Sequence, residues 1–163
     1  MKYPDNDKVF IDIIKQYEKV IYKVCSFYAS SEHPISDLYQ DVVYMLWRNF
    51  SKFRNECSIS TWIYRVALNT CISGIRNTKR IPDSVLSEYL DNILFESENA
   101  DVDDIREMYR LIYQLKELDR AMVLLYLEGH SYKEIADITG LTLTNVATKL
   151  NRIKEKLKQS LKN

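Results

Sequence analysis

The chain has 163 residues, 46% hydrophobic and 28% charged, so it is long enough for one medium domain or two small ones and too apolar to be disordered. Only three glycines and three prolines occur, which argues against sheets that need many turns and favours helices. No apolar run approaches the roughly 18 residues of a membrane span, and no signal peptide is recognisable, so we expect a cytoplasmic protein without membrane insertion.

The zero net charge conceals blocks of opposite sign. Residues 1–80 carry 12 basic and 8 acidic side chains, residues 81–104 carry 8 acidic and no basic ones, and residues 105–163 carry 11 basic and 7 acidic ones. This asymmetry is typical of linked modules, which we predict as domains at 1–80 and 105–163 joined by an acidic linker at 81–104.

Positive charge gathers at the end of each module. The bases concerned are Arg65, Arg76, Lys79 and Arg80 in the first module and Lys149, Arg152, Lys154, Lys156, Lys158 and Lys162 in the second. Such local patches suit phosphate binding, although a solvated helix face produces the same pattern.

The first module contains three predicted helices. Apolar residues recur at helical spacing from Val9 to Tyr28 and again from Ile35 to Phe50, with a polar break at 30–34. The polar stretch 51–60 lacks this period and predicts a loop. A third helix begins at Ser60 or Thr61, either of which is a good N-cap, and runs to about residue 78. The acidic segment 81–101 also holds apolar residues, so we interpret it as a tether that can form a short helix.

The second module is predicted to be helical throughout. Helices span 102–115 and 119–127, and Gly129 ends the second of them. Ser131 and Glu134 form a capping box that opens a short helix ended by Gly140. Thr142 or Thr144 caps the last helix, whose apolar stripe is Val146, Leu150, Ile153, Leu157 and Leu161. No strand is predicted, so the expected fold class is all-α, with two small helical domains.

Residues 131–152, SYKEIADITGLTLTNVATKLNR, have the spacing of a helix-turn-helix. Ala136 is small where the two helices approach, Gly140 lies where the turn needs a left-handed backbone, and Val146 follows six residues later. The first turns of the second helix of such a motif enter the major groove, and its outward positions read bases and phosphates. These positions are Leu143, Thr144, Asn145, Thr148, Lys149 and Arg152. The motif predicts DNA binding, with a basic helical hairpin as the alternative.

Three strings together resemble sigma-70 family factors of the extracytoplasmic-function (ECF) group. They are DLYQDVVYMLWRNFSKF at 37–53, STWIYRVALNTCISGIRNTKR at 60–80 and the helix-turn-helix. The resemblance covers about residues 8–160 in the order of the family, which is region 2, a short linker and region 4. It implies a transcription initiation factor that is not an enzyme and has bacterial core RNA polymerase (its β′ clamp and β flap), promoter DNA and an anti-sigma factor as partners.

The resemblance also assigns roles, in which region 2 melts and holds the −10 element and region 4 reads the −35 element. The polymerase-binding residues would be Asp37, Leu38, Gln40, Asp41, Val42, Leu46 and Trp47. The −10 contacts would be Phe53, Asn55, Ser58, Trp62, Tyr64, Arg65, Asn69, Arg76, Lys79 and Arg80. The −35 contacts would be the six outward helix-turn-helix positions. For Leu38, Val42, Leu46, Trp47 and Trp62 an ordinary core position is the alternative.

Two positions depart from the family pattern. Ser73-Gly74 stands where the family often has Asp-Arg, so one basic contact is missing, and Leu143 replaces a commonly polar residue and would touch a thymine methyl.

The sequence contains no catalytic constellation, cofactor motif or metal cluster, and Cys25, Cys57 and Cys71 are widely spaced. Two other functions remain open, a helix-turn-helix regulator that acts without core polymerase and a sigma-like decoy that does not bind DNA.

Overall fold

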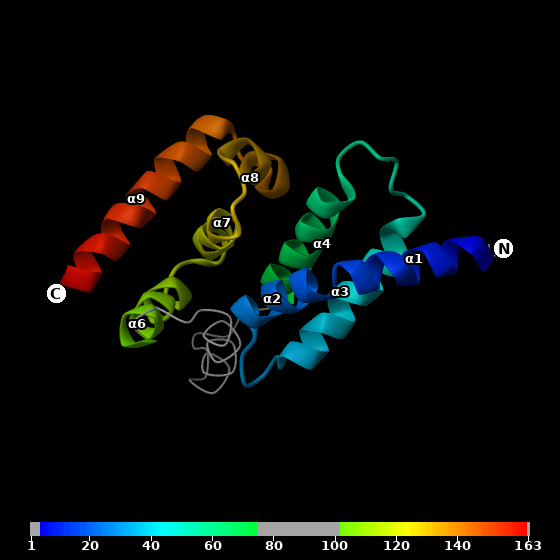
Figure 1. Cartoon of the computed structure of the whole chain (residues 1–163), viewed down its shortest axis with the longest axis horizontal. Coiled ribbons are helices and arrows are strands. Elements are labelled where there is room, and N and C mark those ends of the chain that lie inside the picture. The colour runs from blue at the N-terminus through cyan, green and yellow to red at the C-terminus, as the bar shows by residue number, and fades with distance from the viewer. Residues whose placement is uncertain (1–3, 75–101, 163) are drawn as a thin grey trace. The chain divides into compact units, whose positions relative to one another are not determined.

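In the computed structural model the chain divides into two compact units, Met1–Asn77 and Thr78–Asn163. The structure describes residues 4–74 and 102–162, and within these ranges it contains eight helices and no strand (Figure 1), which confirms the all-α prediction. No helix in the described ranges has both the length and the apolar character needed to cross a membrane. The end of the third predicted helix and the tether at 81–101 lie outside the described residues.

The first unit consists of α1 (Pro4–Gln16), α2 (Glu18–Tyr28), α3 (Ile35–Phe50) and α4 (Ile59–Gly74). Helices α2, α3 and α4 pack against one another in pairs, and α1 lies against α2 and α3. Apolar residues on the facing sides of these helices are buried together, and burying them supplies the main driving force for folding. The core includes Phe10, Ile21, Val24, Cys25, Phe27, Tyr28, Leu38, Val42, Leu46, Ile63, Ala67, Leu68 and Cys71.

The single helix predicted from Val9 to Tyr28 is wrong, because the chain bends at Tyr17 and forms α1 and α2. Tyr17 has φ −104° and ψ 12°, outside the helical range. The backbone hydrogen bonds Tyr17 N to Ile13 O and Ile21 N to Tyr17 O, both 3.0 Å, still cross the bend. Phe10 of α1 contacts Phe50 of α3, with ring centroids 5.3 Å apart, while α2 packs on α3 and α4. The apolar period continues through the bend and therefore does not reveal it.

The start of α4 also differs from the prediction, since Ser58 caps it instead of Ser60 or Thr61. The Ser58 hydroxyl accepts a hydrogen bond from Thr61 N at 3.1 Å, and Ser58 O accepts one from Trp62 N at 3.1 Å. Ser58 directly precedes the first residue of α4, so its side-chain oxygen reaches the backbone amide of the third helical residue, Thr61. That amide has no acceptor within the helix itself. Helix α4 contacts both α2 and α3, and its buried residues are Ile63, Tyr64, Ala67, Leu68 and Cys71.

The second unit consists of α6 (Val102–Tyr113), α7 (Glu117–Leu127), α8 (Tyr132–Thr139) and α9 (Leu143–Lys162). Helix α9 contacts the other three helices. The helix that carries the predicted DNA-facing residues is therefore also the central packing element of the second unit. Its core residues Val146, Leu150 and Ile153 are buried. The prediction that Leu161 belongs to this stripe is wrong, because Leu161 is 46% exposed, and α9 extends beyond the core that the other helices form.

A buried arginine closes the end of α6. Arg120 in α7 is only 8% exposed. Its Nη2 donates hydrogen bonds to the carbonyl oxygens of Tyr113 at 2.7 Å and Leu115 at 3.2 Å, and its guanidinium lies 5.6 Å from the centre of the Tyr113 ring. These carbonyls lie at the end of α6, where the helix itself supplies no donors. Arg120 therefore joins α6 to α7.

Candidate binding surfaces

The seven residues predicted to bind polymerase separate into two groups on α3. Leu38, Val42 and Leu46 are buried in the core of the first unit, so their apolar character is explained by packing. The other four are exposed and share the outward side of the helix at spacings of three, four and seven residues. They are Asp37, Gln40, Asp41 and Trp47.

Sequence reasoning missed Tyr44 and the exposed Arg48 on this outward side. Tyr44 is 56% exposed and Trp47, one turn further along, is 46% exposed. Both line a shallow groove of about 530 Å³ between α1 and α3. The remaining lining residues are Asp7, Phe10, Ile11, Tyr39, Gln40 and Val43. The i, i+3 and i+4 spacing of Tyr44 to Trp47 and Gln40 was the available signal, but it does not tell an exposed tyrosine from a buried one.

The loop before α4 is held to that helix by aromatic contacts. The rings of Phe53 and Trp62 lie 5.0 Å apart at 31°, and Phe50 lies 6.3 Å from Trp62. Asn55 has φ 57°, a left-handed conformation that asparagine tolerates better than most residues. Phe53, Asn55 and Ser58 are thus placed by the same short loop, and Trp62 is half-buried against it.

On α4 the predicted −10 residues fall into two groups, one on an accessible face of the helix and one buried in the core. Trp62, Arg65 and Asn69 follow one another at spacings of three and four residues and so share one face, on which Asn69 is exposed and Arg65 is half-buried near Cys57 Sγ at 3.8 Å. Tyr64 lies on the other side and is 5% exposed, which leaves its ring no free face on which a base could stack. Arg76, Lys79 and Arg80 lie outside the described residues.

The helix-turn-helix begins with the predicted capping box. The Ser131 hydroxyl accepts a hydrogen bond from Glu134 N at 3.1 Å, and Glu134 Oε2 accepts one from Ser131 N at 2.7 Å. Gly140 ends α8 with φ 78°, and Gly129 precedes the motif with φ 85°. Thr142, one of the two predicted caps, accepts a hydrogen bond from Asn145 N at 3.2 Å. The local signals of the sequence are confirmed here because each acts within a few residues.

Acidic pH is expected to weaken this capping box. The hydrogen bonds from the Ser131 backbone and side chain lower the pKa of Glu134 from its usual 4.5. A carboxyl whose pKa is lower in the folded chain stabilises the fold above its unfolded pKa and loses that contribution as pH falls through the folded pKa. We expect the melting temperature of the second unit to depend less on pH below about 4.5 in Glu134→Gln than in the wild type.

Thermal unfolding between about pH 3 and 6 measures this difference when circular dichroism, which follows both units, is compared with tryptophan fluorescence, which follows the first unit alone. Glu155→Gln, the same carboxyl-to-amide change at an exposed position of α9, is the matched control. Equal pH dependence in Glu134→Gln and the wild type would contradict the prediction.

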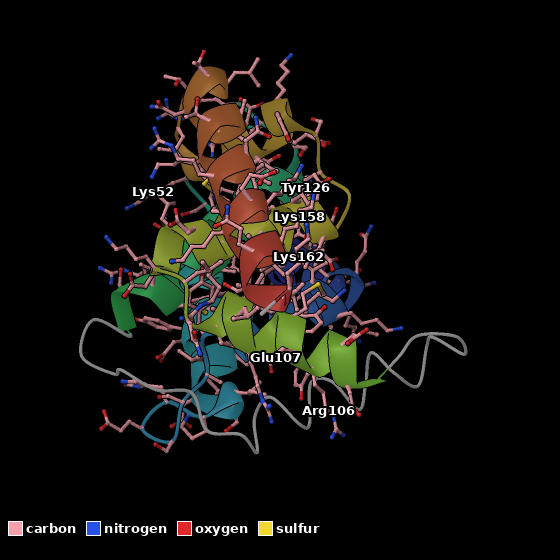
Figure 2. All side chains as sticks on the ribbon, turned by 90° about the vertical axis from the view of Figure 1, so that its left-hand side faces the viewer. Lys52, Arg106, Glu107, Tyr126, Lys158 and Lys162 are labelled. Carbon is pink, nitrogen blue, oxygen red and sulfur yellow. The ribbon has the colours of Figure 1, made fainter. Side chains whose placement is uncertain are left out.

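The predicted −35 residues lie on the outer side of the start of α9. Val146 between them is buried, which fixes the rotation of the helix. Lys149 Nζ lies 3.9 Å from Asp119 Oδ1 of α7, so this base has an internal acidic neighbour. The exposed members are Leu143, Thr144, Asn145, Thr148 and Arg152. Further along the same helix, Lys158 and Lys162 project from its C-terminal turns (Figure 2).

Cys25, Cys57 and Cys71 are free thiols. Among the residues that the structure describes, no group of three or more His, Cys, Asp or Glu side chains is placed to hold a metal ion.

Two family models match the chain. Sigma-70 region 2 matches residues 13–81, and Sigma-70, region 4 matches residues 105–157. Similar proteins include the ECF RNA polymerase sigma-E factor of Haemophilus influenzae, which is 26% identical over 94% of this chain and 88% of the relative. The ECF RNA polymerase sigma factor SigW of Bacillus subtilis is 27% identical over 99% of this chain and 93% of the relative.

Two solved structures have a similar fold, each with a TM-score of 0.70 and 16% sequence identity. One is the sigma factor RpoE in complex with the anti-sigma factor NepR from Bartonella quintana, and the match covers 95% of this chain and 98% of the other. The other is CnrH in complex with the cytosolic domain of CnrY, with 96% and 89% covered. At this identity the likeness concerns the fold alone.

Proposed function

The chain belongs to the sigma-70 family as a sigma factor of the ECF group, and from this we propose how its two units share the work of promoter recognition. The family is a non-catalytic part of RNA polymerase, so bond formation belongs to the core enzyme. The first unit would bind the β′ clamp and hold the melted −10 strand. The second would bind the β flap and the −35 duplex. The protein would act in the cytoplasm, with the polymerase.

The outward side of α3 carries the polymerase part of the proposal. Its exposed residues include acidic and polar side chains, the basic Arg48, and Tyr44 and Trp47, whose rings line the groove between α1 and α3. A large aromatic anchor with charged residues around it is typical of binding hot spots. Because Leu38, Val42 and Leu46 are occupied by the core, we propose Asp37, Gln40, Asp41, Tyr44 and Trp47 as the contact residues.

The −10 part rests on the loop and on one face of α4. Extruding a base from the duplex costs a few kcal/mol, which stacking and contacts to the base edge must recover. We propose that the loop residues Phe53, Asn55 and Ser58 and the helix residues Trp62, Arg65 and Asn69 form this capture site. Tyr64 would support it from the core, and Arg76, Lys79 and Arg80 would meet phosphates.

Run-off transcription tests the proposal directly. Bacterial core polymerase is incubated with fragmented genomic DNA, with and without this protein. New transcripts with defined starts are the expected result and would reveal both promoter elements. Core binding without new transcripts would favour the decoy, and binding to duplex DNA without core binding would favour an independent regulator.

An anti-sigma factor is the proposed inhibitor, because one similar solved structure is the sigma factor RpoE in complex with the anti-sigma factor NepR. In another, CnrH is bound to the cytosolic domain of CnrY. An inhibitor that covers the outward side of α3 would exclude polymerase by competition. The binding of core polymerase and of the inhibitor would then be mutually exclusive.

Loss of a single basic side chain from α9 should weaken promoter binding in a salt-dependent manner. Each of Lys149→Ala and Arg152→Ala is expected to lower the slope of log affinity against log salt by about one unit, because one phosphate contact and its released counterion are lost. Lys149 must exchange Asp119 for phosphate, so its loss should cost less affinity than that of Arg152.

The assay measures open or closed promoter complexes of the holoenzyme on a promoter found by run-off transcription, over a range of salt concentrations. Arg106→Ala, which removes an exposed base from α6 (Figure 2), is the control. An unchanged slope in both α9 variants would refute the assignment of the recognition helix.

A further inference from the structure

One basic residue of α9, Lys154, has different surroundings from the other basic residues of that helix. Lys154 Nζ lies 4.0 Å from the ring centre of Tyr126 and 5.7 Å from that of Tyr132. The ammonium also donates a hydrogen bond to Tyr132 Oη at 3.2 Å. The two tyrosine rings lie 6.4 Å apart at 51°. Lys154 therefore has two internal partners, although the sequence groups it with the basic residues predicted to bind phosphate.

These three residues come from three helices of the helix-turn-helix unit. Tyr126 is in the last turn of α7, Tyr132 is the first residue of α8, and Lys154 is in the middle of α9. A cation over an aromatic face is attracted by the ring's quadrupole, whose face is electrostatically negative, and the attraction grows as the pair loses water. The contact of Lys154 with both rings thus links α9 to the two helices that precede it.

Lys154 lies away from the polar DNA-facing residues Asn145 and Arg152. Leu143 is only about 20° from it around the helix, but about 16 Å nearer the N-terminus of α9. At 100° per residue, Lys154 is about 160° around the helix from Arg152 and about 180° from Asn145. A phosphate bound at the outer side of α9 would lie out of reach of an ammonium held on the opposite side. Hydrogen bonds to Tyr126 and Tyr132 raise the pKa of Lys154, which is consistent with a stabilised ammonium at this position.

We propose that Lys154 is a positioning residue, which holds α9 against Tyr126 of α7 and Tyr132 of α8 and so sets the angle at which the first turns of α9 meet the −35 duplex. It acts through the tyrosines and does not bind phosphate. The inference rests on the proposed function, since it assumes that the outer residues of α9 read DNA. It predicts that the basic residue Lys154 affects the affinity for promoter DNA without contributing to the salt dependence of that affinity.

The test compares Lys154→Met, which keeps the length of the side chain and removes its charge, with Lys154→Arg, which keeps a cation over the rings. Lys149→Met is the matched loss of charge on the outer side. The promoter affinity of the holoenzyme is measured at several salt concentrations, and circular dichroism verifies that each variant is folded.

Lys154→Met is expected to weaken binding by about threefold to tenfold at every salt concentration with an unchanged slope, and Lys154→Arg to restore affinity. Lys149→Met should lower the slope by about one unit. In a double-mutant cycle Tyr132→Phe should add little to Lys154→Met, because both remove the same hydrogen bond.

Three results would overturn the inference. A slope lowered by about one unit in Lys154→Met would make Lys154 a phosphate ligand. Wild-type affinity in Lys154→Met would remove any role in binding, and failure of Lys154→Arg to restore affinity would show that the cation is not what matters. If Lys149→Met and Arg152→Ala also bound like the wild type at all salt concentrations, the proposed reading of DNA by α9 would fail instead.

Discussion

Changing Asp41 to Arg and Trp47 to Ala together is expected to abolish holoenzyme formation, with the affinity for core polymerase falling about 100-fold or more. The first change reverses a charge on the outward side of α3, and the second removes the largest exposed ring on that side, which is 46% exposed. Because neither side chain belongs to the core, the first unit should stay folded and the loss should come from the interface alone.

Binding to core polymerase can be measured by fluorescence anisotropy of the labelled protein and compared with run-off transcription. Glu32→Arg, the same reversal of an exposed acid in the loop between α2 and α3, is the control and should bind normally. A double variant that forms holoenzyme with wild-type affinity would refute the proposed polymerase surface. Substituting Leu46 would not test the surface, because this residue is buried and its loss would destabilise the core.

Arg120→Ala is expected to destabilise the second unit by about 2–4 kcal/mol. The substitution removes the donors for the carbonyl oxygens of Tyr113 and Leu115 and leaves them without that partner at the end of α6. It also removes the packing of the guanidinium on the Tyr113 ring. Since α9 packs against both α6 and α7, loosening their junction should weaken −35 binding as well.

The chain allows the two units to be followed separately during unfolding in urea. Both tryptophans, Trp47 and Trp62, belong to the first unit, so tryptophan fluorescence follows that unit alone, whereas circular dichroism at 222 nm follows both. Arg120→Ala should lower only the part of the transition that fluorescence does not detect.

Arg110→Ala, which removes an exposed arginine whose partner Glu107 lies 3.5 Å away, should change stability by less than about 0.5 kcal/mol. A wild-type midpoint by circular dichroism in Arg120→Ala would contradict the role of Arg120.

Features that depend on a few neighbouring residues could be predicted well. The bounds of α3, the capping box of Ser131 and Glu134, and the left-handed Gly129 and Gly140 all follow from signals within one or two turns. The bend at Tyr17 and the cap at Ser58 could not be predicted in this way. A bend leaves the apolar period intact, and several hydroxyl residues compete for one cap, so packing against the other helices decides between them.

Residue type was a weaker guide to the candidate sites. Asp37, Leu38, Gln40, Asp41, Val42, Leu46 and Trp47 form one motif in the sequence, and only the packed structure separates the buried members from the exposed ones. Tyr64 resembles a stacking residue but is buried in the core. Arg120 and Lys154 resemble basic surface residues, yet the first bonds the carbonyl oxygens at the end of a helix and the second lies over two tyrosine rings.

The sequence by itself determined the all-helical class, the helix-turn-helix with its caps, and the family to which the chain belongs, because these depend on spacing along the chain. Only the tertiary structure decided which members of each motif face solvent and which bases are already engaged. That choice depends on which helix faces meet, and such contacts join residues that are distant in the sequence.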